Sequence, residues 1–172
     1  MKRTVFAATL IALVSGCAGT ADHTETSATA TLEPRSGSQV RGTVTFTQVG
    51  ADIVRVSGEI SGHTQGPKGF HIHEKGDCSD AQAMSAGGHF NPGKHKHGGP
   101  YEPQRHAGDL GNISFNDKGV AKFSFVVGGI SVGSDKADGI VGRSVVVHAA
   151  ADDLQTDPTG NSGGRVACGV IR

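Results

Sequence analysis

The chain of 172 residues contains little of what marks several protein classes: it has no tryptophan, one tyrosine and two methionines. Basic and acidic residues balance, and no basic run is interleaved with aromatic residues, so a nucleic-acid partner is not expected. Sustained 3.6-residue periodicity is absent, so only short helical turns in loops are expected. The apolar stretch 5–14 is too short for a good transmembrane helix.

Glycine is abundant, with 27 residues, and short runs of Val, Ile and Phe are scattered along the chain. Alternation of apolar and polar residues is typical of strands with one buried face. Such runs occur around 40–46, 54–60, 113–115 and 123–127, and turn sequences such as NDKG separate them. The chain is long enough for one domain with a real core, so we expect a single all-β sandwich or barrel.

The N-terminus has the pattern of a secretory signal peptide over residues 1–16, with Lys2 and Arg3 before the apolar stretch. The block VSGC resembles a bacterial lipobox, in which Cys17 would be lipidated and become the new N-terminus. The alternative is an ordinary signal peptide that contains a cysteine. Residues 17–37 are small and polar, so a lipidated cysteine and flexible tether are expected there, followed by the folded domain at 38–172. We therefore expect export to the periplasmic or cell-envelope side and a membrane anchor.

Export also decides how the other two cysteines are interpreted. If Cys17 is lipidated or removed, Cys78 and Cys168 remain as an even pair. In an oxidising compartment they are expected to form a disulfide, and the alternative is two buried free thiols. The bridge would tie a loop beside the first histidine pair to the last strand.

Histidine is the most biased residue type, with nine copies. His71 and His73 lie two positions apart in GFHIHEKGDC, so on a strand both rings point to the same face. His148 ends the apolar run SVVVH. Imidazole suits both zinc and copper, so these histidines are candidate metal ligands.

A second group of candidate ligands lies in a Gly/Pro-rich stretch, where His89, His97 and His106 are followed by Asp109. One carboxylate among histidines suits zinc. Long loops without secondary structure are uncommon unless they are functional or held in place, so a metal is expected to hold this loop.

Six motifs, in order along the chain, resemble the copper/zinc superoxide dismutase family: GFHIHEKGDC, GGHFNP, KHGGP, RHAGDLGN, GRSVVVHAAADDL and GNSGGRVACGVI. The resemblance covers roughly residues 38–172. It implies a flattened eight-stranded Greek-key β-barrel, an immunoglobulin-like sandwich architecture. It also implies conversion of superoxide to dioxygen and hydrogen peroxide.

The resemblance implies one copper and one zinc per chain, with copper for redox cycling and zinc for structure. The implied ligands are His71, His73, His89 and His148 for copper, and His89, His97, His106 and Asp109 for zinc.

Three residues receive further roles from the resemblance. His89 would bridge the metals and return a proton to peroxide, and Arg165 would attract and position superoxide. Asp152 would accept hydrogen bonds from the outer nitrogens of His71 and His97 and fix both rings. The alternatives are a surface arginine for Arg165 and a solvated loop acid for Asp152.

The sequence departs from the family pattern in several places. The loop after His148 is short and has no lysine, so Arg165 and copper are expected to provide most of the local attraction. Lys75 stands where relatives with the eukaryotic type of dimer usually have an apolar residue, and the chain stops at Arg172. We therefore expect a monomer or a bacterial-type dimer.

Three more loop residues are expected to lie outside the ligand sets. His63 stands where the family often has leucine, and is expected to be partly exposed at a strand end. His95 is expected to be exposed or a weak extra ligand. Asp157 is expected to be a solvated loop acid.

The main competing function is a periplasmic copper or zinc binding or storage protein on the same scaffold. Storage needs ligands, but neither an anion-guiding arginine nor a bridging imidazole, so Arg165 and His89 favour the enzyme. A structural or adhesive sandwich without metals is disfavoured by the complete ligand sets, and a copper-only relative by the zinc set.

Overall fold

The computed structural model describes residues 26–133 and 135–172. Within them, all regular structure is strand except one short 3-10 turn, η1 (Met84–Ala86). The strands are β1 (Ser27–Pro34), β2 (Arg41–Gly50), β3 (Ile53–Ser61), β4 (Gly66–His73), β5 (Asp109–Phe115), β6 (Val120–Gly128), β7 (Ser144–His148) and β8 (Arg165–Val170). The described residues contain no helix with the length and apolar character needed to cross a membrane.

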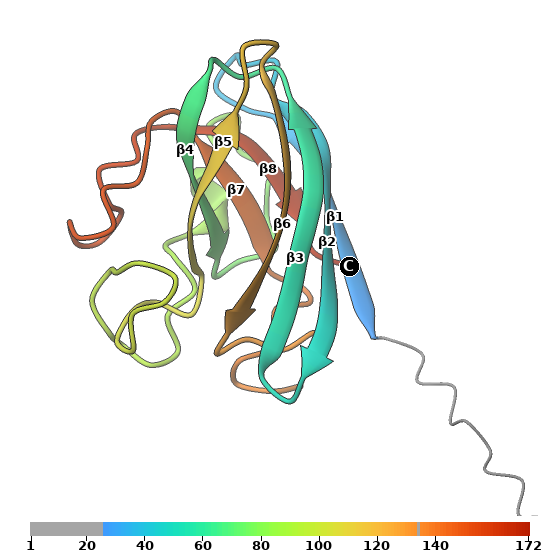
Figure 1. Ribbon diagram of the computed structural model, residues 1–172, viewed down its shortest axis with the longest axis vertical. Helices are drawn as coiled ribbons and strands as arrows, with labels where there is room; N and C mark the ends of the chain where they lie inside the picture. Colours follow the sequence, from blue (N-terminus) through green and yellow to red (C-terminus); the bar gives the residue numbers. More distant parts are fainter. Residues whose placement is uncertain (1–25, 134) are drawn as a thin grey trace, which may run out of the picture.

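The eight strands form one antiparallel sheet in the order β5-β4-β7-β8-β1-β2-β3-β6. The end strands β5 and β6 are joined by the turn at 116–119, where Asn116 and Val120 pair through their backbones, and they contact each other. The sheet therefore curls into a nearly closed, flattened barrel, with β1, β2, β3 and β6 in one layer and β4, β5, β7 and β8 in the other (Figure 1). The predicted all-β Greek-key barrel is confirmed.

The core forms where alternating side chains of the two layers meet. Val54 and Val56 on β3 are fully buried, while Ile53, before Val54, and Arg55, between the two valines, are exposed. Phe70 and Ile72 on β4 are also fully buried. Strand β7 is buried at all five positions, as expected for a strand covered on both faces.

The structure corrects the domain boundary expected at residue 38. Part of the expected tether, Ser27–Pro34, is strand β1, which pairs with β2 and, through its end, with β8. Ala28, Ala30 and Leu32 alternate with Thr and point into the core, with at most 3% of their surface exposed. Small residues at alternate positions occur on the buried face of a strand and also in flexible tethers, so composition alone gave the wrong prediction here. The predicted signal peptide and Cys17 lie outside the described residues.

Two long connections position the candidate site. Segment 74–108 joins β4 to β5, and segment 149–164 joins β7 to β8. Figure 1 shows both on the same side of the barrel, outside the layer that contains β4, β5 and β7. The candidate ligands therefore lie between the outer surface of this layer and the two loops.

Candidate metal centre

Strands β4 and β7 place three of the histidines. His71 and His73 share one face of β4, while Phe70 and Ile72 point into the barrel. In the neighbouring strand, His71 pairs with Val146 and His73 with Ser144, and β7 ends at His148. The interpretation that the two imidazoles of β4 share a face is confirmed.

The segment after β4 turns back and pairs with the C-terminal end of β4, which brings His89 next to His73. Phe90 N donates to the Ile72 carbonyl at 2.8 Å, and Glu74 N donates to the Gly88 carbonyl at 3.0 Å. His89 consequently forms an isolated β-bridge with His73. The hydrogen-bonded backbone, and not a helix or strand of its own, positions this ring.

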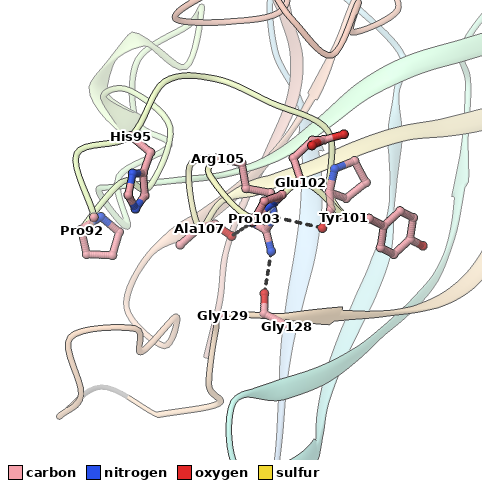
Figure 2. Close-up of a pocket in the computed structure, with 11 residues that line it drawn as sticks. Pro92, His95, Tyr101, Glu102, Pro103, Arg105, Ala107, Gly128 and Gly129 are labelled. Atoms are coloured by element: carbon pink, nitrogen blue, oxygen red, sulfur yellow. Dashed lines mark hydrogen bonds between the residues drawn. The ribbon is translucent and has the colours of Figure 1, made fainter.

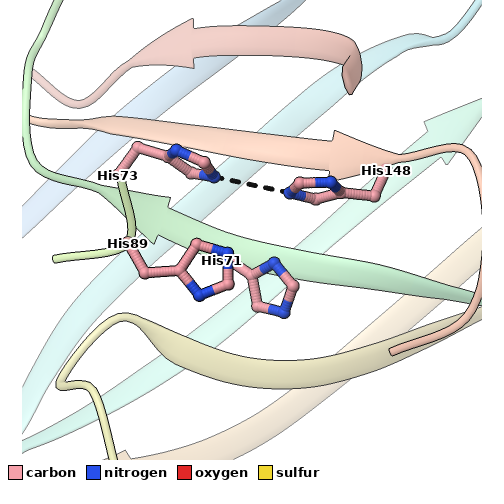
Figure 3. Close-up of side chains that lie close together, drawn as sticks. All are labelled: His71, His73, His89 and His148. Atoms are coloured by element: carbon pink, nitrogen blue, oxygen red, sulfur yellow. Dashed lines mark hydrogen bonds between the residues drawn. The ribbon is translucent and has the colours of Figure 1, made fainter. Parts of the chain in front are cut away.

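The first donor set consists of His71, His73, His89 and His148 (Figure 3). Each offers one ring nitrogen, and these four atoms all lie within 4.8 Å of one another. Nε2 of His73 and Nε2 of His148 are 3.4 Å apart. All four residues are buried, so the four nitrogens converge at a site that is largely shielded from solvent.

The outer ring nitrogens fix which nitrogen faces inward. In His73, Nδ1 donates to the Gly87 carbonyl at 3.0 Å, and in His148, Nδ1 donates to the Gly163 carbonyl at 3.2 Å. A carbonyl oxygen can only accept, so the proton lies on Nδ1 and Nε2 keeps a free lone pair. Burial, followed by the neighbouring charges, holds the pKa of both rings well below the usual value. Both are therefore neutral imidazoles, the form that binds metal.

The second donor set consists of His89, His97, His106 and Asp109. Nδ1 of each ring lies close to Asp109 Oδ1, at 2.8, 3.1 and 3.2 Å in that order. The contact from His97 lacks hydrogen-bond geometry, which leaves its Nδ1 buried without a bonded partner. Three nitrogens and one carboxylate meeting at one point fit the tetrahedral ligand set of zinc.

Backbone and side-chain donors hold the carboxylate of Asp109 in place. Its Oδ2 accepts hydrogen bonds from His106 N at 2.9 Å and from Gly98 N at 3.2 Å. Burial raises the pKa of Asp109, but hydrogen bonds from His106 and His89 and the close contact with His97 outweigh it and hold this pKa well below its usual range. The group is therefore an ionised carboxylate, ready to bind a cation.

His89 is the member that the two sets share. Its Nδ1 faces Asp109, and its Nε2, directed into the first set, is buried without a hydrogen-bond partner. Burial is the main reason that its pKa falls to about 4, although hydrogen bonding to Asp109 opposes the shift. Buried polar atoms almost always have a partner, so an unpaired Nε2 beside three other nitrogens is a candidate metal-binding atom. The same holds for Nδ1 of His71.

Asp152 connects the two sets from outside. Its Oδ2 accepts from His71 Nε2 at 2.7 Å, and its Oδ1 accepts from His97 Nε2 at 2.8 Å. Both outer nitrogens therefore carry protons, so a metal would bind these two rings through their inward Nδ1 atoms. Burial raises the pKa of Asp152, but the hydrogen bonds from His71 and His97 lower it by more, so the group is ionised. The structure thus places Asp152 where the resemblance implied.

His97 lies between the carboxylates of Asp109 and Asp152. Burial lowers the pKa of His97, but the Asp109 carboxylate beside Nδ1 and the hydrogen bond with Asp152 overcome that effect and raise it to about 10. A metal that binds Nδ1 must therefore displace a proton from this ring.

Arg165 lines a cavity of about 360 Å³. The other lining residues are Ser36, Gln82, Met84, His148, Thr159, Gly163 and Gly164. The guanidinium donates to the Ala83 carbonyl at 2.7 Å and to the Gly87 carbonyl at 2.6 Å. Gly87 also accepts from His73, so Arg165 and a histidine of the first set share one backbone anchor. Arg165 is thus fixed at the opening beside the first donor set.

The predicted disulfide between Cys78 and Cys168 is confirmed. It ties the segment after β4 to β8, the strand that begins with Arg165. Arg35 Nε reinforces the same junction by donating to the Cys78 carbonyl at 2.8 Å. The covalent link and the Arg165 hydrogen bonds therefore hold the same loop.

A separate cavity of about 510 Å³ lies beside the loop that carries the second donor set (Figure 2). Arg105 crosses it and donates to the carbonyls of Pro100 at 2.9 Å and Gly128 at 2.6 Å. These bonds fasten the loop to the end of β6, next to His106. His95 also lines this cavity, is exposed as predicted, and belongs to neither donor set.

Two supporting residues escaped the sequence interpretation. Asn112 on β5 makes two hydrogen bonds with the backbone of Asp152. Its Nδ2 donates to the Asp152 carbonyl at 2.9 Å, and its Oδ1 accepts from Asp152 N at 2.8 Å. Asp157 is exposed, as expected of a loop acid, but it accepts from His97 N at 2.8 Å and lies 3.7 Å from His106 Nε2. A polar residue within the buried part of a strand is the only signal that the sequence offers for Asn112.

Comparison with known proteins agrees with this geometry. Residues 40–171 match the family model described as copper/zinc superoxide dismutase (SODC). The crystal structure of the clock protein EA4 is similar, with a TM-score of 0.77 and 45% sequence identity over 86% of this chain and 94% of that chain. The matched range includes both donor sets, Asp152, Arg165 and the disulfide.

Proposed function

The chain belongs to the copper/zinc superoxide dismutase family, and from this membership we propose that it is a metal-dependent oxidoreductase acting on superoxide. Two superoxide anions and two protons would yield one dioxygen and one hydrogen peroxide. The observation that carries the proposal is the pair of complete, buried donor sets that share His89, with Arg165 fixed beside the first set.

The two donor sets differ in the metal that they suit. Four imidazole nitrogens favour copper in the first set, and three nitrogens with one carboxylate favour zinc in the second. Bound copper would supply one-electron oxidation and reduction of superoxide, and bound zinc would hold the loop 91–108. The orphaned nitrogens of His71, His89 and His97 support a fit to both metals.

The protein's own groups supply the anion binding and the proton. Arg165 keeps its charge at any physiological pH, and beside the opening it attracts the superoxide anion. Nε2 of His89 lies within the first set and is an unbonded nitrogen. It can hold a proton and donate it to the reduced oxygen species. Nδ1 of His89 belongs to the second donor set with Asp109, so ligation in that set would keep the ring in place during this transfer.

Similarity to the clock protein EA4 does not by itself assign catalysis, and a copper or zinc storage protein would use the same ligands. The experiment must therefore separate metal binding from turnover. We expect the purified domain to bind one copper and one zinc per chain and to dismutate superoxide. Full metal content without dismutation would support storage and contradict the enzyme.

A matched pair of histidine variants tests the assignment of the metals. His148→Ala should lose copper and activity and keep zinc, because only the first set contains His148. His95→Ala is the control, since this exposed ring belongs to neither set. Activity retained in His148→Ala would contradict the copper assignment.

We further propose export and attachment to a membrane by lipid at Cys17, supported by the signal-like segment 1–16 and the VSGC block. Globomycin-type inhibition of lipoprotein processing should leave an unprocessed precursor, and Cys17→Ser should release the protein from membranes. A mature N-terminus found beyond Cys17 by mass spectrometry would contradict lipidation.

A further inference from the structure

His63 lies outside both donor sets, in the connection between β3 and β4, but its ring reaches the backbone of a ligand. Its Nε2 is 3.1 Å from the carbonyl oxygen of His148. The ring is half-buried and packs against Phe115, with ring centroids 5.0 Å apart. The contact joins residues 85 positions apart in the chain, so it ties two separate elements together.

A second hydrogen bond fixes the tautomer of His63. The backbone N–H of Thr64 donates to Nδ1 at 2.7 Å. A backbone N–H can only donate, so Nδ1 has a lone pair and, in the neutral ring, the proton lies on Nε2. Nε2 is therefore the donor and the His148 carbonyl is the acceptor. The bond has one direction, and both ends of the ring are engaged.

The backbone pairing of β7 with its neighbouring strands is irregular at His148, the residue that His63 contacts. Pairing of β7 with β8 shifts register between Val147 and His148. On the β4 side, Gly69 N donates to the Ala150 carbonyl at 2.9 Å, two residues beyond His148. The Ala149 carbonyl between them receives only a long contact of 3.4 Å from Lys68 Nζ. The side chain of His63 therefore binds the ligand's backbone at a point where strand pairing is irregular.

We propose that His63 is a positioning residue for the copper ligand His148. His63 gives the His148–Ala149 peptide a hydrogen bond on its carbonyl side, while the N–H of the same peptide donates to the Gly164 carbonyl at 2.8 Å. The bond from Nδ1 of His148 to the Gly163 carbonyl, at 3.2 Å, sets the ring's rotation. Loss of the His63 bond leaves the carbonyl side of this peptide without its hydrogen bond, so the plane from which the ring projects is held less firmly. This inference rests on the proposed copper site.

The test compares two substitutions of His63. His63→Leu keeps bulk against Phe115 and removes the donor, whereas His63→Gln keeps an N–H donor near the position of Nε2. Competition against a copper chelator should show about tenfold weaker Cu(II) binding in His63→Leu, the lower end of what outer partners of metal ligands contribute. The Cu(II) electron paramagnetic resonance spectrum should change as well. His63→Gln should restore both readouts, and zinc binding should not change in either variant.

Lys68→Met is the control, because Lys68 makes the long, exposed contact to the adjacent carbonyl. It should leave copper affinity and the spectrum as in the unsubstituted protein. An unchanged affinity and spectrum in His63→Leu would overturn the inference. So would equal losses in His63→Leu and His63→Gln, because the hydrogen bond would then not be the cause.

A measurement on the metal-free protein separates this inference from the proposed function. Long-range ¹H–¹⁵N spectra should show the His63 ring protonated at Nε2 and not at Nδ1. A ring protonated at Nδ1 would overturn the inference, whatever the metal content. If the purified protein binds zinc but no copper, the proposed function fails and so does the role of His63 as a positioning residue for copper, even where the spectra confirm the tautomer.

Discussion

Replacement of Gly160 by alanine should displace the carboxylate that joins the two donor sets. Gly160 lies in the loop after β7 with a φ of +60°. A methyl group there would lie 2.6 Å from Cγ of Asp152 and 2.7 Å from Nε2 of His97. Real Cβ atoms do not approach other atoms so closely, so either the loop or Asp152 has to move.

The magnitude has two parts. The left-handed conformation costs an alanine about 1–2 kcal/mol. Displacement of Asp152 would also weaken its hydrogen bonds with His71 and His97, and hydrogen bonds to charged groups contribute about 1.5–3 kcal/mol each. Together these give a loss of about 4–8 kcal/mol in the free energy of unfolding. Metal affinity should fall about 10–100-fold because the outer nitrogens lose their partner.

Gly37→Ala is the matched control, because Gly37 has a similar φ of +73° and its new methyl group would meet no other atom within 4 Å. It should lose only the conformational part of the stability and bind zinc normally. Urea unfolding and zinc competition with a chelator measure the two quantities. Equal stability and equal zinc affinity in the two variants would refute the role assigned to Asp152.

Three further predictions concern the disulfide, the anion site and the second donor set. Replacing Cys78 and Cys168 by serine should lower the free energy of unfolding by about 4–5 kcal/mol, because the chain-entropy model gives this value for a sequence separation of 90. A loss below about 1 kcal/mol in urea unfolding would contradict this prediction. If the proposed function holds, Arg165→Ala should keep both metals, slow dismutation and flatten its dependence on ionic strength. The same salt dependence as the unsubstituted protein would exclude steering by this residue. Zinc binding should release a proton near neutral pH, since His97 with a pKa of about 10 is protonated below that pH and must lose a proton to bind. Affinity should therefore rise with pH between 7 and 10, and calorimetry in buffers of different ionisation enthalpy counts the protons.

Short-range periodicity allowed much of the fold to be predicted. Alternation on β3 placed Val54 and Val56 in the core, and the spacing of His71 and His73 placed both rings on one face. These predictions succeed because side-chain direction along a strand repeats every two residues, whatever the tertiary context. The same periodicity in Ser27–Pro34 was hidden, because small residues with threonine also fit an unstructured tether. Pairing with β2 decided this case.

The sequence, with its resemblance to a family, also determined which residues would meet: both donor sets, Asp152 and the disulfide lie as expected. It did not determine which nitrogen of His73 and His148 faces inward, nor that Asn112 and His63 hold the backbones of Asp152 and His148. A ring's free nitrogen depends on the acceptor that meets the other nitrogen, and in these two rings the acceptors are the carbonyls of Gly87 and Gly163. Every residue has a backbone carbonyl, so the amino-acid sequence does not reveal which carbonyl accepts the hydrogen bond. Only the folded backbone brings a particular oxygen to a particular ring.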